Sequence, residues 1–79
     1  MQKRSLTIHG HRTSISLEEP FWMALNDIAK ARQQSLASLV QMIDKDRDGG
    51  LSSAIRVFIL AELRHQLAAS TTTKTSQTF

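Results

Sequence analysis

The segment "RTSISL", residues 12–17, constrains the fold most, because it alternates between polar and apolar residues and leads almost directly into a proline-containing helix. Ile15 and Leu17 fall on one side of it, and this period of two with β-branched residues predicts a half-buried strand. The preceding segment "SLTIH" alternates in the opposite phase, so the chain needs a turn, a bulge or a break near Gly10. The N-terminus therefore holds either a hairpin through "HGHR" or a loose arm that leads into one strand.

Three helices are expected after this strand. The first covers residues 19–32, with a proline in its first turn and apolar residues at helical spacing. Ser35 is a good N-cap for a second helix, which the glycine pair Gly49–Gly50 ends. Ser52 or Ser53 is expected to cap a third helix. Apolar residues surround most of that helix, so it needs cover on several sides.

The length of the chain and its lack of cysteine limit the kind of domain it can form. A chain of 79 residues holds one small domain that buries about 60% of its unfolded surface, and no disulfide can reinforce it. No apolar run approaches the ~20 residues that span a bilayer, and no signal peptide is recognised. We expect a cytoplasmic protein with a basic arm or extra strand over residues 1–11, a folded domain over residues 12–69 and a disordered tail over residues 70–79.

Basic residues are concentrated near the N-terminus. Residues 1–17 contain Lys3, Arg4 and Arg12 and no acidic residue, whereas acidic and basic residues are balanced in the rest of the chain. An acid-free basic segment attracts polyanions, most obviously nucleic acid or an anionic membrane surface. A terminus that only increases solubility is the alternative.

The segment "DKDRDGGLSSAI", residues 44–55, begins like a calcium loop of the EF-hand type. Asp44, Asp46 and Asp48 alternate, and a glycine follows at the sixth place. Such a loop needs a bidentate carboxylate at its twelfth place, however, and Ile55 stands there. A solvated helix end with a glycine stop explains the same residues, so no calcium site is expected.

Other chemical sites are not evident in the sequence. His9 and His11 could share a metal ion on one strand face, but the only further histidine is the remote His65, so no metal site is expected. No nucleophile–base arrangement and no glycine-rich phosphate loop can be recognised. We therefore expect neither an enzyme nor a bound cofactor.

The order of a basic arm, a strand, a helix, a short turn and a second helix resembles the ribbon-helix-helix family of DNA-binding proteins. The stretch from Arg12 to Asp44, "RTSISLEEPFWMALNDIAKARQQSLASLVQMID", carries the resemblance through "HRTSISLE", the aromatic residue early in the first helix, and "SLASLV". "GLSSAIRVFILAELR" resembles the third helix of a bacterial subgroup of short members. The implied fold is mainly helical with a short β ribbon: a ribbon-helix-helix homodimer with an extra C-terminal helix.

Physical reasoning also favours a homodimer. One strand has no partner within its own chain, and an isolated strand leaves its backbone hydrogen-bonding groups unpaired. Two chains related by a two-fold axis can pair their strands antiparallel and share one core, which also compensates for the small size of each chain. We expect no stable folded monomer.

The resemblance implies that the ribbon enters the major groove of double-stranded DNA, with outward side chains against base edges. Those residues are Arg12, Ser14 and Ser16. Arginine can hold guanine through two hydrogen bonds, whereas serine is an undemanding donor and acceptor to several bases. The alternative for Arg12 is a solvated residue on a ribbon that only dimerises.

The resemblance also implies contacts to phosphates. The start of the second helix would hold a phosphate through Ser35 and the backbone of Leu36, with Gln34 within reach. The connection "RQQS" lacks the glycine often found there. Lys3 and Arg4 would add sequence-independent attraction.

The expected function is that of a dimeric DNA-binding protein that regulates transcription. The alternative is an antitoxin-like or other interaction module, in which the same dimer holds a protein partner through the third helix or the tail without reading a DNA sequence. Trp22 lies on the apolar stripe of the first helix and is expected in the core rather than as a stacking platform.

Overall fold

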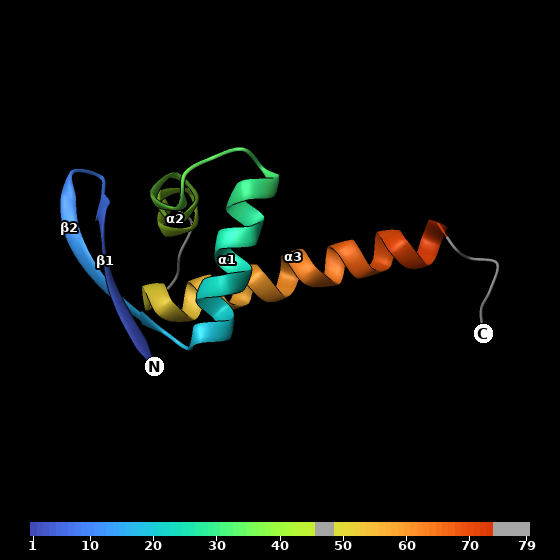
Figure 1. The fold of residues 1–79 in the computed structure, drawn as a ribbon, viewed down its shortest axis with the longest axis horizontal. Helices are drawn as coiled ribbons and strands as arrows, with labels where there is room; N and C mark the ends of the chain where they lie inside the picture. The colour runs from blue at the N-terminus through green and yellow to red at the C-terminus, as the bar shows by residue number, and fades with distance from the viewer. Residues whose placement is uncertain (46–48, 74–79) are drawn as a thin grey trace.

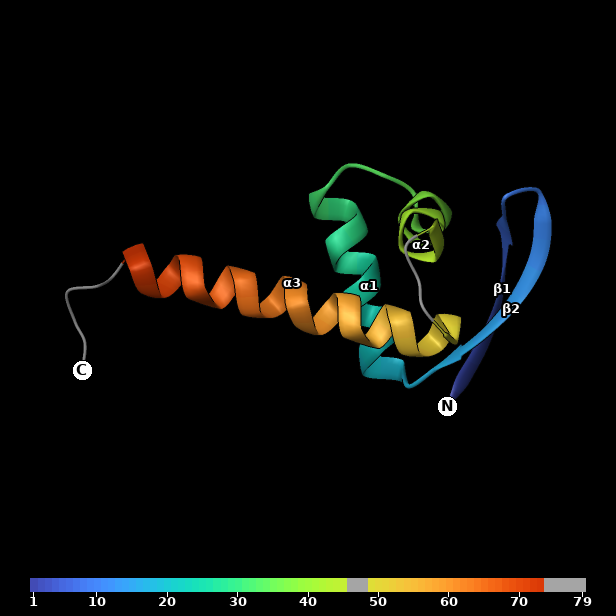
Figure 2. The same ribbon diagram turned by 180° about the vertical axis from the view of Figure 1, so that it is seen from behind.

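The computed structural model describes residues 1–45 and 49–73, which form a β hairpin followed by three helices (Figures 1 and 2). The elements are β1 (Gln2–Ile8), β2 (His11–Leu17), α1 (Glu19–Ala31), α2 (Leu36–Lys45) and α3 (Leu51–Thr73). The helices lie on one side of the hairpin, and α3 runs away from it past α1 (Figure 1). The expected architecture, mainly helical with a short β ribbon and an additional C-terminal helix, is confirmed.

The N-terminal residues form the hairpin, which was one of the two alternatives. β1 pairs with β2 in antiparallel register from Gln2↔Leu17 to Ile8↔His11. The expectation that the strand at residues 12–17 has no partner in its own chain is therefore wrong. The two segments alternate in opposite phase, so a two-residue turn places the apolar residues of both on one face.

The turn consists of His9 and Gly10, which have φ values of 51° and 81°. Positive φ at both central residues is the requirement of a type I′ turn, whose twist matches that of the strands. Glycine adopts this conformation at little cost, whereas a histidine needs support. The His9 N–H donates to Gln41 Oε1 at 3.0 Å, and His9 Nε2 lies 3.5 Å from Asp44 Oδ2. Both contacts hold the turn against α2.

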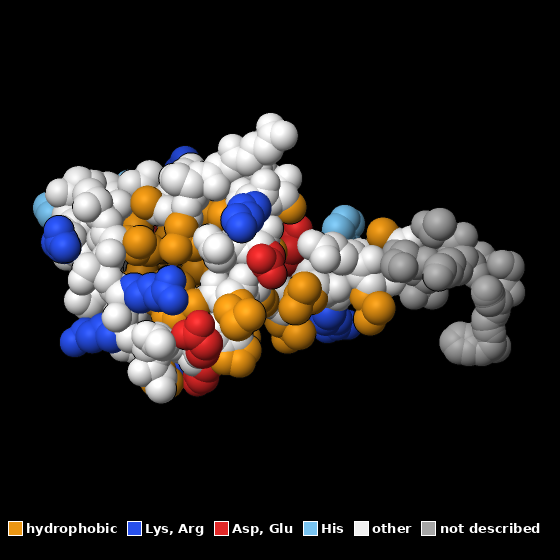
Figure 3. All heavy atoms as spheres, in the orientation of Figure 1, with side chains coloured by type: hydrophobic (Ala, Val, Ile, Leu, Met, Phe, Trp, Pro, Cys, Tyr) orange, Lys and Arg blue, Asp and Glu red, His pale blue; other side chains and the backbone are white. Residues whose placement is uncertain are grey.

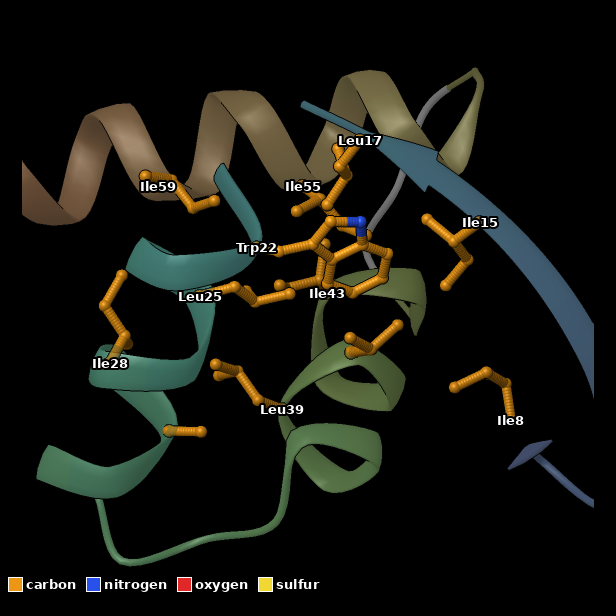
Figure 4. Packing of buried hydrophobic residues seen from close by; sticks show 12 residues of the cluster. Ile8, Ile15, Leu17, Trp22, Leu25, Ile28, Leu39, Ile43, Ile55 and Ile59 are labelled. Atoms are coloured by element: carbon orange, nitrogen blue, oxygen red, sulfur yellow. The ribbon is translucent and has the colours of Figure 1, made fainter. Parts of the chain in front are cut away.

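The core lies between the inner face of the hairpin and the three helices (Figure 4). Its buried side chains are Ile8, Ile15, Leu17, Trp22, Leu25, Ile28, Ala29, Leu39, Val40, Ile43, Ile55 and Ile59. Trp22 is only 1% exposed, and its indole N–H donates to the Gln2 carbonyl at 3.0 Å, so its polar atom is satisfied. Its expected place in the core is confirmed.

The link between α1 and α2 ends the first helix with a Schellman motif. The Gln33 N–H donates to the Lys30 carbonyl and the Gln34 N–H to the Ala29 carbonyl, both at 3.0 Å. Gln33 has a φ of 57°, the left-handed conformation that glycine adopts most easily. The glycine missing from this connection is thus replaced by a glutamine in the same backbone conformation.

Gln33→Gly should therefore raise the free energy of unfolding, by about 0.5–1 kcal/mol after the greater freedom of glycine in the unfolded chain is subtracted. The measurement is the urea midpoint at unchanged m-value. Gln34→Gly is the matched control and should lower the midpoint, because the Gln34 side chain donates to Ser38 Oγ at 3.1 Å and its φ is not positive. Equal shifts in the two variants would contradict this account.

The third helix begins earlier than expected and extends further. α3 starts at Leu51, so Ser52 lies inside its first turn and the predicted serine cap is wrong. The Gly50 carbonyl accepts the Ala54 N–H at 3.0 Å instead. The helix continues to Thr73, whereas the tail was expected to begin at residue 70. Residues 74–79 of the expected tail lie outside the described residues.

Among the described residues, ion pairs from Arg56 and Arg32 connect α3 to the rest of the fold. Arg56 Nε and Nη2 each lie 2.9 Å from Glu18 Oε1, and Arg32 Nη2 lies 3.0 Å from Glu62 Oε1. A hydrogen bond with its own backbone and the hydrogen bond from Arg56 together hold the pKa of Glu18 below its ordinary value. No helix in the described ranges is both long enough and apolar enough to cross a membrane.

The calcium-loop pattern can be followed only in part. Asp46 and Asp48 lie outside the described residues. Ile55, at the place of the missing carboxylate, is fully buried in the core, so this position faces the protein interior. Within residues 1–45 and 49–73, no three His, Cys, Asp or Glu side chains gather as metal ligands would.

Candidate nucleic-acid interface

The hairpin has two faces of different chemistry. Residues paired across an antiparallel ladder share a face, so the partners of Arg12, Ser14 and Ser16 lie beside them. We call the resulting surface the outer face, which consists of Lys3, Ser5, Thr7, Arg12, Ser14 and Ser16. Five of these residues are exposed and Ser16 is half-buried. The opposite face carries Ile15 and Leu17 into the core.

Charge on the outer face is positive and lies at its two ends. Arg12 pairs with Thr7 near the turn, and Lys3 pairs with Ser16 at the other end. Hydroxyl side chains fill the area between them, and residues 1–17 contain no acidic residue. Lys and Arg side chains stand out on the hairpin side of the molecule in Figure 3. The surface therefore offers hydrogen-bonding groups between two cations.

Arg4 lies apart from this surface. It pairs with Ile15 and so belongs to the inner face. Its guanidinium carbon lies 5.1 Å from the centre of the Trp22 ring, a cation–π contact that packs β1 onto α1. The structure therefore separates Lys3 from Arg4, which the charge pattern had grouped together. A contribution of Arg4 to DNA binding stays a prediction, and it is expected to be smaller than that of Lys3 because Arg4 lies on the inner face.

The second edge of β2 has no strand beside it within the described residues, because the sheet contains only β1 and β2. The pair Ile8 and His11 closes the turn, and hydrogen-bonded and non-hydrogen-bonded pairs alternate from there. The backbone N–H and C=O groups of Arg12, Ser14 and Ser16 consequently point away from β1. In agreement with this, the Ser16 carbonyl accepts the Ser52 hydroxyl at 3.0 Å. The rest of this edge can accept another strand.

The three residues expected to hold a phosphate meet at the start of α2. Ser35 is the N-cap, since its Oγ accepts the Ser38 N–H at 3.0 Å. Gln34 lies beside it and also bonds Ser38, and Leu36 is the first residue of the helix. These residues lie on the side of the hairpin that the helices cover and not on the outer face, because α2 packs against the inner face of β1. A phosphate contact here stays a prediction.

Comparison with known protein families yields a match over most of the chain. A family model described as a ribbon-helix-helix domain matches residues 1–63. No curated protein and no solved structure matches the chain. The matched range includes the whole hairpin, α1, α2 and the part of α3 that packs on them.

Proposed function

This chain belongs to the ribbon-helix-helix family, whose domains generally bind DNA as dimers, and we propose from this premise that it is a dimeric transcriptional regulator that reads the major groove with its outer face. The observation that carries the proposal is the outer face itself, an acid-free surface with Arg12 and Lys3 at its ends. Such a protein would act on DNA in the bacterial cytoplasm, without catalysis and without a cofactor.

The proposed dimer forms through the second edge of β2. Two copies related by a two-fold axis pair these edges antiparallel, giving the strand order β1-β2-β2-β1. A register that places Ser14 opposite Ser14 of the partner subunit uses the backbone groups that point away from β1. Pairing would also protect an edge that otherwise invites aggregation. The dimer thus extends a hairpin that each chain forms by itself.

The width of this sheet assigns different roles to the two strands. Neighbouring strands lie about 4.8 Å apart, so the two β1 strands are separated by about 14 Å. The major groove is about 12 Å wide, so only the two β2 strands fit inside it. Arg12, Ser14 and Ser16 would face the bases, and Lys3 would lie at the groove wall near a phosphate. The start of α2, with Gln34, Ser35 and Leu36, remains a further phosphate contact in this proposal.

A second candidate function is an antitoxin-like interaction module. The exposed apolar residues of α3 favour it, because monomeric proteins seldom leave such a stripe in water. In that case the dimer would hold a protein partner and would not read a DNA sequence.

Selection of bound sequences from a random pool of double-stranded DNA tests the proposed function. We expect enrichment of a site with two-fold symmetry, bound at least 10³-fold more tightly than scrambled DNA at the same salt concentration. The melting temperature of the protein should rise with its concentration, because an obligate dimer gains stability by mass action. If no sequence is enriched, the proposal that this protein recognises a specific DNA sequence is refuted.

Lys3→Ala should weaken binding to all DNA sequences alike and flatten the salt dependence of the binding constant. The expected loss is about 0.9 units of the log–log slope for each phosphate contact, so roughly two units for the dimer. Arg4→Ala is the matched control, because it removes the same charge from the neighbouring residue on the inner face. It should change the slope less but lower the melting temperature, because it removes the cation–π interaction with Trp22. Equal slopes in the two variants would contradict the assignment of Lys3 to the groove wall.

A further inference from the structure

The third helix carries an apolar face that the rest of residues 1–45 and 49–73 leaves exposed. Ile55 and Ile59 are buried against the other elements. On another side of the helix, Val57, Leu60 and Leu63 are 65%, 57% and 47% exposed. Hydrophobic side chains continue along the helix beyond the body of the protein in Figure 3. We call Val57, Leu60 and Leu63 the α3 stripe.

The α3 stripe borders an apolar hollow of about 260 Å³ between α1 and α3. Its lining consists of Phe21, Arg56, Val57, Ile59, Leu60 and Leu63. The Arg56 guanidinium carbon lies 5.8 Å from the centre of the Phe21 ring, and the same side chain is held by Glu18. The hollow therefore has an apolar wall and a charged group fixed at its rim. This is the form of a surface that accepts apolar side chains from a partner.

The α3 stripe is continuous with the unpaired edge of β2. Ser52, in the first turn of α3, bonds the Ser16 carbonyl on that edge. Arg56, Leu60 and Leu63 follow it at the spacing i+4, i+8 and i+11, which keeps them on one side of a helix. This side of α3 thus begins at the strand edge with two polar residues, Ser52 and Arg56, and becomes apolar at Leu60 and Leu63. The edge and the stripe form one surface.

The positions of the helices determine what a second copy would meet there. The helices α2 and α3 pack against each other, but of the two strands α2 contacts mainly β1, whereas α3 contacts mainly β2. When two β2 edges pair, the two α3 helices therefore lie next to the two-fold axis and the α2 helices lie away from it. In one chain, α3 extends from the side of the hairpin on which all the helices lie (Figures 1 and 2). The two-fold axis of the proposed ribbon is perpendicular to the sheet, so the α3 helices of both copies would lie on the same face of the sheet.

We propose that the α3 stripe packs against the α3 stripe of a second copy, as a second layer of the dimer interface that continues from the paired β2 edges. This rests on the dimer of the proposed function. Stable interfaces bury about 1,200–2,000 Å², and a strand edge that contributes mainly backbone hydrogen bonds supplies little apolar area. The α3 stripe supplies that area at the place where the second copy must lie.

Single cysteine variants test the proposal, because the full chain contains no cysteine of its own. Leu60→Cys should link two copies through a short thiol-reactive cross-linker, as should Ser14→Cys in the ribbon. Met23→Cys is the matched control, because Met23 is exposed to a similar extent, 59%, but lies on α1 away from the stripe. It should not cross-link.

The outcomes separate this inference from the proposed function. Cross-linking through Ser14→Cys without Leu60→Cys overturns the α3 contact and leaves the ribbon dimer intact. Cross-linking through neither refutes both. Cross-linking through Leu60→Cys alone would show an α3 contact without a paired ribbon, which refutes the ribbon dimer and overturns the α3 contact as its second layer. A different protein as the occupant of the stripe would likewise leave Leu60→Cys unlinked in the purified protein.

Leu60→Glu provides a second measurement on the same surface. In sedimentation, it should weaken dimerisation at least tenfold, since each copy loses about one buried leucine. Met23→Glu should leave dimerisation unchanged. DNA binding by Leu60→Glu should recover at higher protein concentration, because the outer face is intact. An unchanged dimer with unchanged helix content would overturn the proposal.

Discussion

Arg12→Ala should weaken binding to a selected DNA site by about 1–3 kcal/mol for each base that the side chain no longer holds, and the proposed dimer carries this residue twice. The combined loss of about 2–6 kcal/mol corresponds to roughly 30-fold to more than 10⁴-fold in affinity. The fold should remain intact, because Arg12 is exposed on the outer face and pairs only with Thr7 across the hairpin.

Comparison of a selected site with scrambled DNA decides how Arg12 acts. A base contact predicts a large loss of affinity on the selected site and a small one on scrambled DNA. Equal losses on both would mean that the side chain touches only phosphate, as expected for Lys3. No loss on either would leave the hairpin as a dimerisation element and favour the interaction module.

Trp22→Ala should lower the free energy of unfolding by about 3–5 kcal/mol, the cost of removing a large aromatic side chain from a packed core. A domain of this size has a total stability of roughly 4–12 kcal/mol, so the variant should lose about a quarter of it or more, and at the lower end of this range it should be largely unfolded. The hairpin should lose the most stability, because β1 is attached to Trp22 twice. The indole N–H donates a hydrogen bond to the Gln2 carbonyl, and the ring makes the cation–π contact with Arg4. Circular dichroism in urea measures the change.

Trp22→Phe separates the two contributions of the side chain. Phenylalanine keeps an aromatic ring in the core but cannot donate to the Gln2 carbonyl, so its cost should be about 1–2 kcal/mol. If the alanine and phenylalanine variants are destabilised equally, the hydrogen bond rather than the packing dominates at this position.

Much of the fold could be predicted from sequence because its signals are local. Three predictions depended only on residues close together in the chain, and all three were correct. They are the strand that ends at Leu17, the helix around Trp22 and the N-cap at Ser35. The start of α3 was missed by two or three residues, because serine is the more usual cap, whereas the structure uses Gly50 before Leu51.

The pairing of the hairpin was harder to predict, since His9–Gly10 is not the Asn-Gly or Asp-Gly pair that marks a type I′ turn most strongly. Support for His9 comes from Gln41, which is remote in sequence. Without the pairing, Ser5 and Thr7 could not be assigned to the outer face. Charge alone also grouped Lys3 with Arg4, although neighbouring residues of a strand point to opposite faces.

The hydrogen bond from the Trp22 indole to the Gln2 carbonyl places the ring at the attachment of β1. The chain has one tryptophan and no tyrosine, so this position can be followed by fluorescence. Ultraviolet emission therefore comes from a single ring at the junction of β1 and α1, and it can follow the hairpin without an added label. Detachment of β1 would hydrate the indole and shift the emission to longer wavelength. A ligand on the outer face would leave the ring buried and the emission nearly unchanged. One optical signal can thus distinguish occupation of the ribbon from its loosening.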